Sequence, residues 1–227
     1  VEPFEIKACP INGEREEKML PSPARDLTLG GGGRFVILSL PREKKIAVFD
    51  VNEAKVVRYL PLAEDEAVLA AGMDKLFVCL PSARVVQRWS LRTFEREVAV
   101  ASPLDGPVTE ACMGWASDGP LLFVAASGER FGGSRTALVD PRTLKTLDLA
   151  VDNDPNGGRG LGANLRPSGD GTVFARPDPY SARTFVVRDG KLRTFNGETS
   201  TFLAAPGADG SFVCTMVGVY TAEMKPV

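Results

Sequence analysis

The stretch LSLPREKKIAVFDVNEAKVV (Leu38–Val57) aligns without gaps on VCLPSARVVQRWSLRTFERE (Val78–Glu97), forty residues further along the chain. Each copy runs from an apolar segment through a turn with Pro and Arg into a second apolar segment. Runs of β-branched and aromatic residues bounded by turn-formers predict strands. TALVDPRTLKTLDL (Thr136–Leu149) repeats the second half of this unit, and TFVVRDGKLRTF (Thr184–Phe195) repeats it in shortened form. The chain is therefore built from an internal repeat of short strands.

A glycine-rich or Asp-Gly turn followed by an apolar run begins each repeat unit. Glycine adopts positive φ without steric conflict, so each copy predicts a β-hairpin corner. Another short apolar segment lies before each turn, which makes four short strands per unit. The spacing of about forty to fifty residues is that of a four-stranded propeller blade. The copies are GGGGRFVIL (Gly30–Leu38), GMDKLFVCL (Gly72–Leu80), SDGPLLFVAA (Ser117–Ala126), SGDGTVFA (Ser168–Ala175) and GADGSFVCTM (Gly207–Met216).

These repeats, without a convincing amphipathic helix, predict an all-β fold: a β-propeller of about five four-stranded blades in one domain, 1–227. Residues 1–25, with apolar segments at Phe4–Cys9 and Glu17–Leu20, are expected to complete the last blade, because a closed ring leaves no unpaired sheet edge. The alternative is an arc of a larger, seven- or eight-bladed propeller. The expected blades are approximately 26–62, 66–101, 107–150, 160–196 and 200–227.

The pairs FD (49–50), WS (89–90) and VD (139–140) occupy the positions at which a WD-repeat blade carries its Trp-Asp pair. The turns SGDG and GADG resemble the S-P-D-G turn of such blades. From Asp26 onward, the chain therefore resembles bacterial WD-repeat-like or YVTN-type propellers in architecture. It departs from the strict WD pattern because, without histidine, it has no Gly-His pair and no histidine-containing tetrad. The resemblance implies a rigid interaction platform, often one module of a larger chain.

Composition excludes several kinds of catalyst and partner. The absence of histidine removes Ser-His-Asp and Cys-His catalysis and imidazole metal ligands. Cys9, Cys79, Cys112 and Cys214 never form C-x-x-C, so we expect small buried side chains rather than a zinc site or redox pair. A formal net charge of −2 gives no reason to expect nucleic acid as a partner.

The remaining features suit a soluble globular protein. No apolar run is long enough to span a bilayer, so membrane insertion is not expected. The first residues, VEPFEIKACP, have neither the charged region nor the apolar core of a signal peptide, which favours a cytoplasmic location. The chain does not begin with Met, and we expect it to be part of a longer, multidomain chain.

The loop DNDPNGG (Asp152–Gly158) begins like a calcium-binding loop. Asp152, Asp154 and Asn156 offer three side-chain oxygens, whereas calcium takes six to eight ligands. Position twelve, where a helical-type loop carries a bidentate Glu, is Ala163. Proline and two glycines also suit a long surface turn. We therefore interpret DNDPNGG first as a binding-face loop between blades and second as a calcium site, and no other cofactor is expected.

Basic residues recur in the loops between the second and third strands of the blades. Equivalent loops lie on one face of a propeller, so these cations are expected to share a rim with interleaved aromatic residues. Arginine and aromatic side chains dominate interface energies and bind carboxylates or an acidic peptide. The links between blades bring acidic residues to this face, so a solvated rim of mixed charge is the alternative. The candidate partner-binding residues are Arg42, Arg84, Arg130, Phe131, Arg135, Arg176, Tyr180 and Arg183.

Together these features favour a non-catalytic interaction module that binds a protein or peptide through one loop face, a step that rests on fold analogy. The alternative is a lactonase- or hydrolase-like propeller enzyme that acts on a small molecule at the central channel. That alternative requires Asp and Glu side chains converging on the axis, and no catalytic residue is assigned. A third hypothesis is an arc that assembles with another chain to complete a ring.

Overall fold

The computed structural model describes residues 17–126, 134–147, 165–177, 182–197 and 201–227. Within these ranges the chain is all-β, apart from the short 3-10 turn η1 (Pro41–Glu43). The described residues contain no helix long and apolar enough to cross a membrane. The described strands form five antiparallel sheets, three of four strands and two of three. Strands that follow one another in sequence are neighbours in each sheet. The all-β prediction with repeated four-stranded sheets is therefore confirmed.

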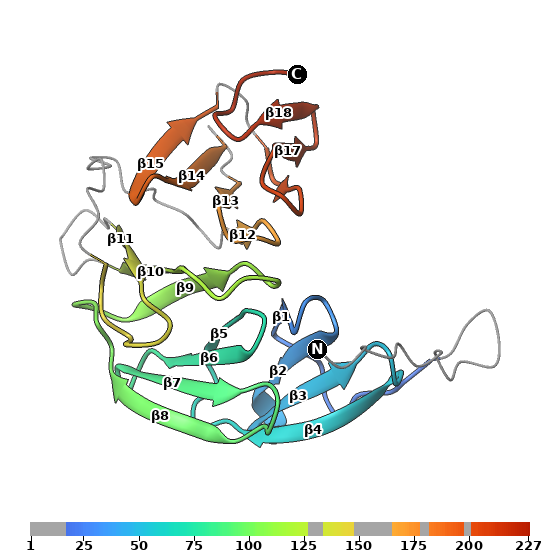
Figure 1. The fold of residues 1–227 in the computed structure, drawn as a ribbon. Coiled ribbons are helices and arrows are strands. Elements are labelled where there is room, and N and C mark those ends of the chain that lie inside the picture. The colour runs from blue at the N-terminus through green and yellow to red at the C-terminus, as the bar shows by residue number, and fades with distance from the viewer. Residues whose placement is uncertain (1–16, 127–133, 148–164, 178–181, 198–200) are drawn as a thin grey trace, which may run out of the picture.

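The strands belong to the sheets in chain order (Figure 1). The first sheet contains β1 (Asp26–Gly30), β2 (Phe35–Leu40), β3 (Lys45–Asp50) and β4 (Lys55–Pro61). The second contains β5 (Val68–Ala71), β6 (Lys75–Leu80), β7 (Val85–Ser90) and β8 (Arg96–Ala101). The third contains β9 (Val108–Met113), β10 (Leu121–Ala126) and β11 (Ser134–Val139). The fourth contains β12 (Arg166–Pro167), β13 (Val173–Arg176), β14 (Arg183–Arg188) and β15 (Lys191–Asn196), and the fifth β16 (Ala204–Pro206), β17 (Phe212–Thr215) and β18 (Val219–Thr221).

Each sheet packs on the next through alternate residues of its strands. Because successive side chains of a strand point to opposite faces, a strand between two sheets needs apolar residues at every position. In β6, Leu76 and Val78 pack toward the first sheet, whereas Phe77 and Cys79 pack toward the third. Two further apolar layers join the third sheet to the fourth and the fourth to the fifth. The five sheets are therefore stacked through four apolar layers.

The sheets form an open arc with their first strands toward a common centre (Figure 1). The first and fifth sheets stand apart, so the ring is not closed in this structure. Of the segments expected to complete the last sheet, residues 17–20 form no strand and residues 4–9 lie outside the described ranges. The edge of β18 instead pairs with the chain's own end: Tyr220 bridges to Pro226, and the Val227 N–H donates to the Val219 carbonyl. The described residues thus show no closure by N-terminal strands.

The inner ends of the sheets are tied together by hydrogen bonds between their first turns. The Gly31 N–H donates to the Gly72 carbonyl at 2.9 Å, and the Met73 N–H donates to the Ser117 carbonyl at 2.8 Å. The same pattern continues to the fourth and fifth sheets. Such close backbone approach requires glycine. A Cβ on Gly30, Gly72 or Gly114 would lie 2.8 Å from the Ala71 Cβ, 2.5 Å from the Ser117 carbonyl oxygen or 2.2 Å from the Gly171 nitrogen, respectively.

The second member of each FD, WS and VD pair caps the turn that follows its strand. Asp50, Ser90 and Asp140 each accept hydrogen bonds from the backbone N–H groups two and three residues further on, at 2.6 to 3.3 Å. Asp50 also accepts a hydrogen bond from the Arg34 guanidinium at 2.8 Å. In short turns, such side-chain acceptors replace the sheet partner that the N–H groups lack. These three residues therefore stabilise the repeat locally.

Candidate functional site in a charged cleft

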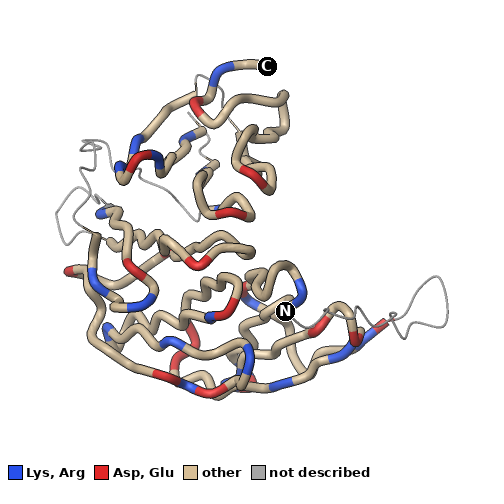
Figure 2. Tube along the Cα trace, viewed as in Figure 1, with Lys and Arg blue, Asp and Glu red and all other residues tan. Residues whose placement is uncertain are grey.

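Antiparallel connections place the turns of each sheet on two opposite faces of the arc. We call the first the linker face, which in the second sheet carries residues 81–84 and 102–107. The second is the turn face, which carries residues 72–74 and 91–95 of the same sheet. The binding residues predicted from the sequence belong to the linker face. Basic and acidic residues are interspersed around the arc (Figure 2), so charge alone does not distinguish the two faces.

Part of the predicted linker-face site falls within the described residues. Arg42 and Arg84 are exposed on equivalent turns, and neither has an ion-pair partner among the described residues. Arg135 lies 3.5 Å from Asp105, with both side chains exposed, a geometry worth little free energy. The predicted residues outside the described ranges are Arg130, Phe131 and Tyr180, together with Asp152, Asp154 and Asn156 of the expected calcium loop.

The other two predicted cations each bind a side chain of the protein, Arg183 at the surface and Arg176 in a buried position. Arg183 donates from Nε to the Asn196 side-chain oxygen at 2.9 Å, across two paired strands. The Arg176 side chain is only 7% exposed, and its Nη2 lies 3.0 Å from Oε1 of Glu110 on β9. Burial raises the pKa of Glu110, and the nearby Arg176 charge opposes that rise. The Arg176–Glu110 pair therefore ties the fourth sheet to the third.

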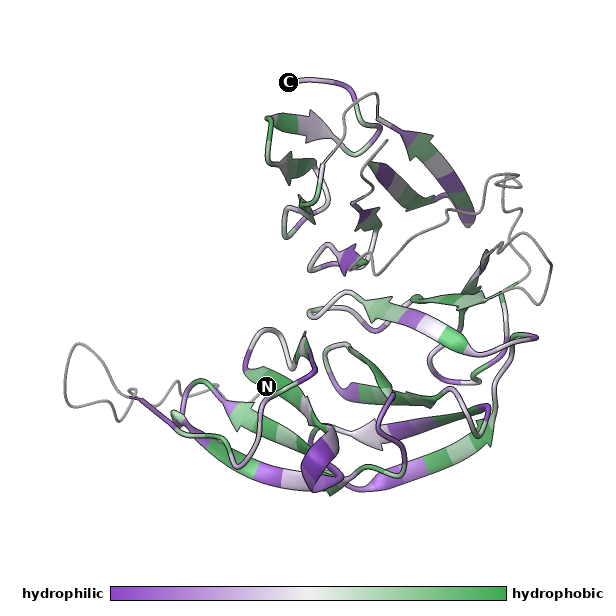
Figure 3. Ribbon diagram, turned by 180° about the vertical axis from the view of Figure 1, so that it is seen from behind, coloured by the Kyte–Doolittle hydropathy of each residue, from purple (hydrophilic) through white to green (hydrophobic). Residues whose placement is uncertain are grey.

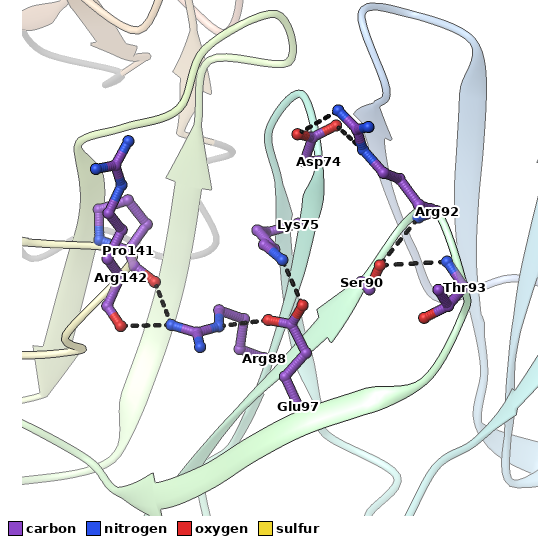
Figure 4. Close-up of polar contacts among 9 residues, drawn as sticks. All are labelled: Asp74, Lys75, Arg88, Ser90, Arg92, Thr93, Glu97, Pro141 and Arg142. Atoms are coloured by element: carbon purple, nitrogen blue, oxygen red, sulfur yellow. Dashed lines mark hydrogen bonds and ion pairs between the residues drawn. The ribbon is translucent and has the colours of Figure 1, made fainter.

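A cleft of about 270 Å³ opens between the second and third sheets, at the turn face. Arg88 on β7 spans it (Figure 4). Its Nε donates to the Glu97 carboxylate at 2.8 Å, and its Nη1 donates to the carbonyl oxygens of Pro141 and Arg142. Arg88 thus connects β8 to the turn after β11. The residues that line the cleft are Asp74, Lys75, Arg88, Met113, Ser117, Asp118, Pro141 and Arg142.

Glu97 lies behind the lining of the cleft and binds two of its cations, Lys75 and Arg88. Its second carboxylate oxygen pairs with the Lys75 ammonium, so the two cations share one anion. The Lys75 hydrogen bond, with a smaller contribution from Arg88, lowers the pKa of Glu97 below its ordinary value. At neutral pH, Lys75, Arg88 and Glu97 therefore form a charged triad with a net charge of about +1.

Two lining residues on the third sheet keep charges available to a ligand. Asp118 and Arg142 are exposed, and neither side chain forms an ion pair with another described residue. Figure 4 shows the Arg142 guanidinium pointing away from that of Arg88. At the far edge, Arg92 holds Asp74 through two bonds of 3.1 and 2.9 Å. A ligand in the cleft would therefore meet Arg142 and Asp118 first.

Sequence reasoning did not single out the cleft, although the repeat contains a signal for it. Three charged residues of the second sheet occupy positions whose equivalents in the first sheet are apolar and pack in the first apolar layer. Charged groups draw water where apolar side chains would join two sheets. The aligned pairs, forty residues apart, are Lys75 with Phe35, Arg88 with Val48 and Glu97 with Val57.

None of the described cysteines lines the cleft. Cys79 and Cys112 are buried in apolar layers, and burial raises the pKa of both thiols. For Cys79 and Cys112, the prediction of small buried side chains is confirmed. Cys214 is only half-buried, and Cys9 lies outside the described ranges. Within those ranges, no three Cys, Asp or Glu side chains gather as a set of metal ligands.

Comparison with solved structures shows which fold the chain resembles. The β-propeller domain of Cps50 (Swd1) from Myceliophteria thermophila matches with a TM-score of 0.52 and 13% identity, over 90% of this chain and 85% of that one. Hydrazine synthase from Kuenenia stuttgartiensis matches with a TM-score of 0.56 and 13% identity, over 90% of this chain but 58% of that one. No protein-family model and no curated protein matches the sequence. The fold is therefore propeller-like. At 13% sequence identity, the two matches support a shared fold and not a shared function.

Proposed function

We propose that the chain is a non-catalytic propeller module, WD-repeat-like or YVTN-like in its blades, that binds a protein or peptide partner in the charged cleft. The observation that supports this proposal is the replacement of three apolar positions of the repeat by Lys75, Arg88 and Glu97. Apolar side chains join two sheets without the desolvation that three charges require, so packing alone does not account for Lys75, Arg88 and Glu97 at this interface.

The size of the cleft favours a peptide side chain as the ligand. Small-molecule and cofactor sites commonly measure about 300 to 1,000 Å³. At about 270 Å³, this cleft admits one or two side chains of a partner that lies across the surface. The cations Lys75, Arg88 and Arg142 outnumber the anions Asp74 and Asp118 in the lining, and guanidinium groups bind carboxylates through paired hydrogen bonds, which favours a carboxylate beside Arg142. We therefore propose an acidic peptide segment as the partner.

The linker-face residues constitute a separate proposal. Arg42 and Arg84 are exposed on equivalent turns and suit a second contact with the same partner. Arg176 is less suited to this role, because its guanidinium is held by Glu110. Calcium binding by Asp152, Asp154 and Asn156 stays a prediction.

The test is selection from a displayed peptide library with the wild-type protein and two charge-reversed variants. Arg142→Glu changes the cleft, and Arg58→Glu changes an exposed arginine of β4 as the matched control. We expect acidic peptides to bind the wild type and Arg58→Glu, with at least tenfold weaker binding to Arg142→Glu. Equal binding to all three proteins, or no enrichment of acidic peptides, would contradict the proposal. Turnover of small esters or lactones by the wild type would favour the enzyme alternative.

A further inference from the structure

Both ends of the arc leave an apolar sheet face without a neighbouring described sheet. On the first sheet, Leu27 and Leu29 of β1 are 57% and 40% exposed. Phe212 of β17, on the fifth sheet, is also 40% exposed. Contiguous exposed apolar surface of this kind marks sites of association in soluble proteins. Figure 3 shows hydrophobic residues along the strands at both ends of the arc.

The strand register shows that the face of the first sheet opposite the second sheet is apolar across its width. Leu27, Leu29 and Tyr59 are its exposed residues, whereas Ala47 is buried and the other residues are half-buried. Side chains of paired residues lie on the same face of a sheet. Two rows of paired residues cross all four strands on the side opposite the second sheet. The rows are Leu27–Leu38–Ala47–Tyr59 and Leu29–Val36–Phe49–Val56.

The repeat assigns a role to this face. The second sheet carries apolar residues at the positions that the strand register makes equivalent, and there they are buried against the first sheet. We call the face that a sheet turns toward the preceding sheet its receiving face. The face of the first sheet opposite the second sheet is therefore a receiving face on which no described sheet packs. By strand register, the equivalent pairs are Leu27 with Leu69, Leu29 with Ala71, Val36 with Leu76, Leu38 with Val78 and Phe49 with Trp89.

The fifth sheet has the complementary surface. The tripeptide Phe212–Cys214 repeats Phe77–Cys79 residue for residue. In the second sheet, Phe77 and Cys79 are fully buried against the third sheet, so they define a presenting face, directed toward the following sheet. In the fifth sheet the middle residue, Val213, packs on the fourth sheet, which leaves Phe212 and its face uncovered.

Each of the four apolar layers joins a presenting face to a receiving face, and among the described sheets one face of each kind has no neighbouring sheet. Because the first and fifth sheets stand apart within one chain (Figures 1 and 3), they do not cover each other. We propose that the fifth sheet of one copy packs on the first sheet of a second copy, so that chains associate head to tail. Such a contact is heterologous, and it generates a closed ring or an open filament.

The first experiment measures the mass of the full chain in solution by light scattering over a range of concentrations. We expect the mass to rise from 24.3 kDa to twice that value or more. Leu29→Asp removes the receiving face and Phe212→Asp removes the presenting face, so each variant alone is expected to stay monomeric. Leu147→Asp is the matched control and is expected to associate like the wild type, because Leu147 is 37% exposed and lies beyond β11, at neither end of the arc.

Mixing the two variants makes the test specific for head-to-tail contact. The Leu29→Asp protein keeps an intact fifth sheet and the Phe212→Asp protein keeps an intact first sheet, so an equal mixture should form a one-to-one heterodimer and nothing larger. Circular dichroism of each variant checks that it is folded. A wild type that stays monomeric at all concentrations would overturn the proposal. So would a Phe212→Asp protein that still dimerises, since its contact would then join two first sheets.

Discussion

Three glycines determine how closely the inner ends of the sheets approach one another. Gly30, Gly72 and Gly114 recur at equal spacing in the chain, and each occupies a position where a Cβ would overlap a neighbour. Around Gly114, the nearest atoms are backbone atoms of Gly171 and Gly169, which cannot rotate away as a side chain would. At these three positions the repeat therefore needs glycine because a Cβ would overlap the neighbouring sheet, and not only because glycine favours turns.

At this scale we predict that Gly114→Ala destabilises the fold. The new Cβ would lie 2.2 Å from the Gly171 nitrogen, so the third and fourth sheets must separate locally. Overpacking of this kind costs about 1 to 3 kcal/mol of unfolding free energy, to be measured by denaturant unfolding. Gly218→Ala is the control, since its nearest neighbour is a Tyr220 ring carbon at 3.7 Å. Equal stability of the two variants would show that the backbone contact is not tight.

Among the elements, the second sheet is unusual because β6, β7 and β8 each contribute one charged residue to the cleft. Lys75, Arg88 and Glu97 meet on the face that β6 otherwise packs against the third sheet through Phe77 and Cys79. One face of this sheet is therefore apolar toward the centre of its strands and charged near the turn face. The charged end also holds the turn after β11, through Arg88.

The triad predicts how stability depends on pH. The folded-state pKa of Glu97 is lower than its ordinary value of 4.5, so its contribution is fully present above that value. The contribution is lost as pH falls through the folded-state pKa, because the protonated carboxyl no longer pairs with the two cations. We expect Glu97→Gln to lower the melting temperature near pH 7 and to reduce the loss of stability on acidification. Thermal unfolding at several pH values, with Glu95→Gln as control, measures this. Parallel profiles for wild type and Glu97→Gln would contradict it.

For the whole molecule, the question is what joins sheets that are far apart in sequence. Apolar layers do most of this, and the Arg176–Glu110 pair adds a charged contact between the third and fourth sheets. Oε2 of Glu110 accepts no hydrogen bond within the described residues. A buried pair with an incomplete set of partners is sensitive to the loss of either member.

We predict that Arg176→Ala destabilises the fold by about 1 to 3 kcal/mol near neutral pH, because it leaves the partly buried Glu110 carboxylate without its cation. Burial raises the pKa of Glu110, and loss of Arg176 raises it further, so the variant should recover stability as pH falls and Glu110 is protonated. The double variant Glu110→Ala with Arg176→Ala should be more stable than Arg176→Ala alone. Denaturant unfolding of the wild type, the two single variants and the double variant gives the interaction energy of the pair as a double-mutant cycle. Unchanged stability of Arg176→Ala, with weaker peptide binding, would instead support the linker-face role.

The repeat by itself determined the strands, the turns and the fold class. Leu38–Val57 and Val78–Glu97 form matching strands and turns because strand propensity and turn chemistry depend on neighbouring residues. The alternation that buries Leu76 toward one sheet and Phe77 toward another is also local, since it follows from the two-residue period of a strand.

Only the tertiary structure decided which charges meet and where the arc ends. The sequence places Arg176 on a rim with other cations, but the stacking of β13 beside β9 brings it to Glu110. The cleft likewise depends on the turn after β11 reaching Arg88 on another sheet. The physical reason is that ion pairs and clefts depend on distances between sheets, which result from the packing of whole apolar layers. A local sequence pattern determines which way a side chain points, whereas the stacking of the sheets determines what that side chain meets.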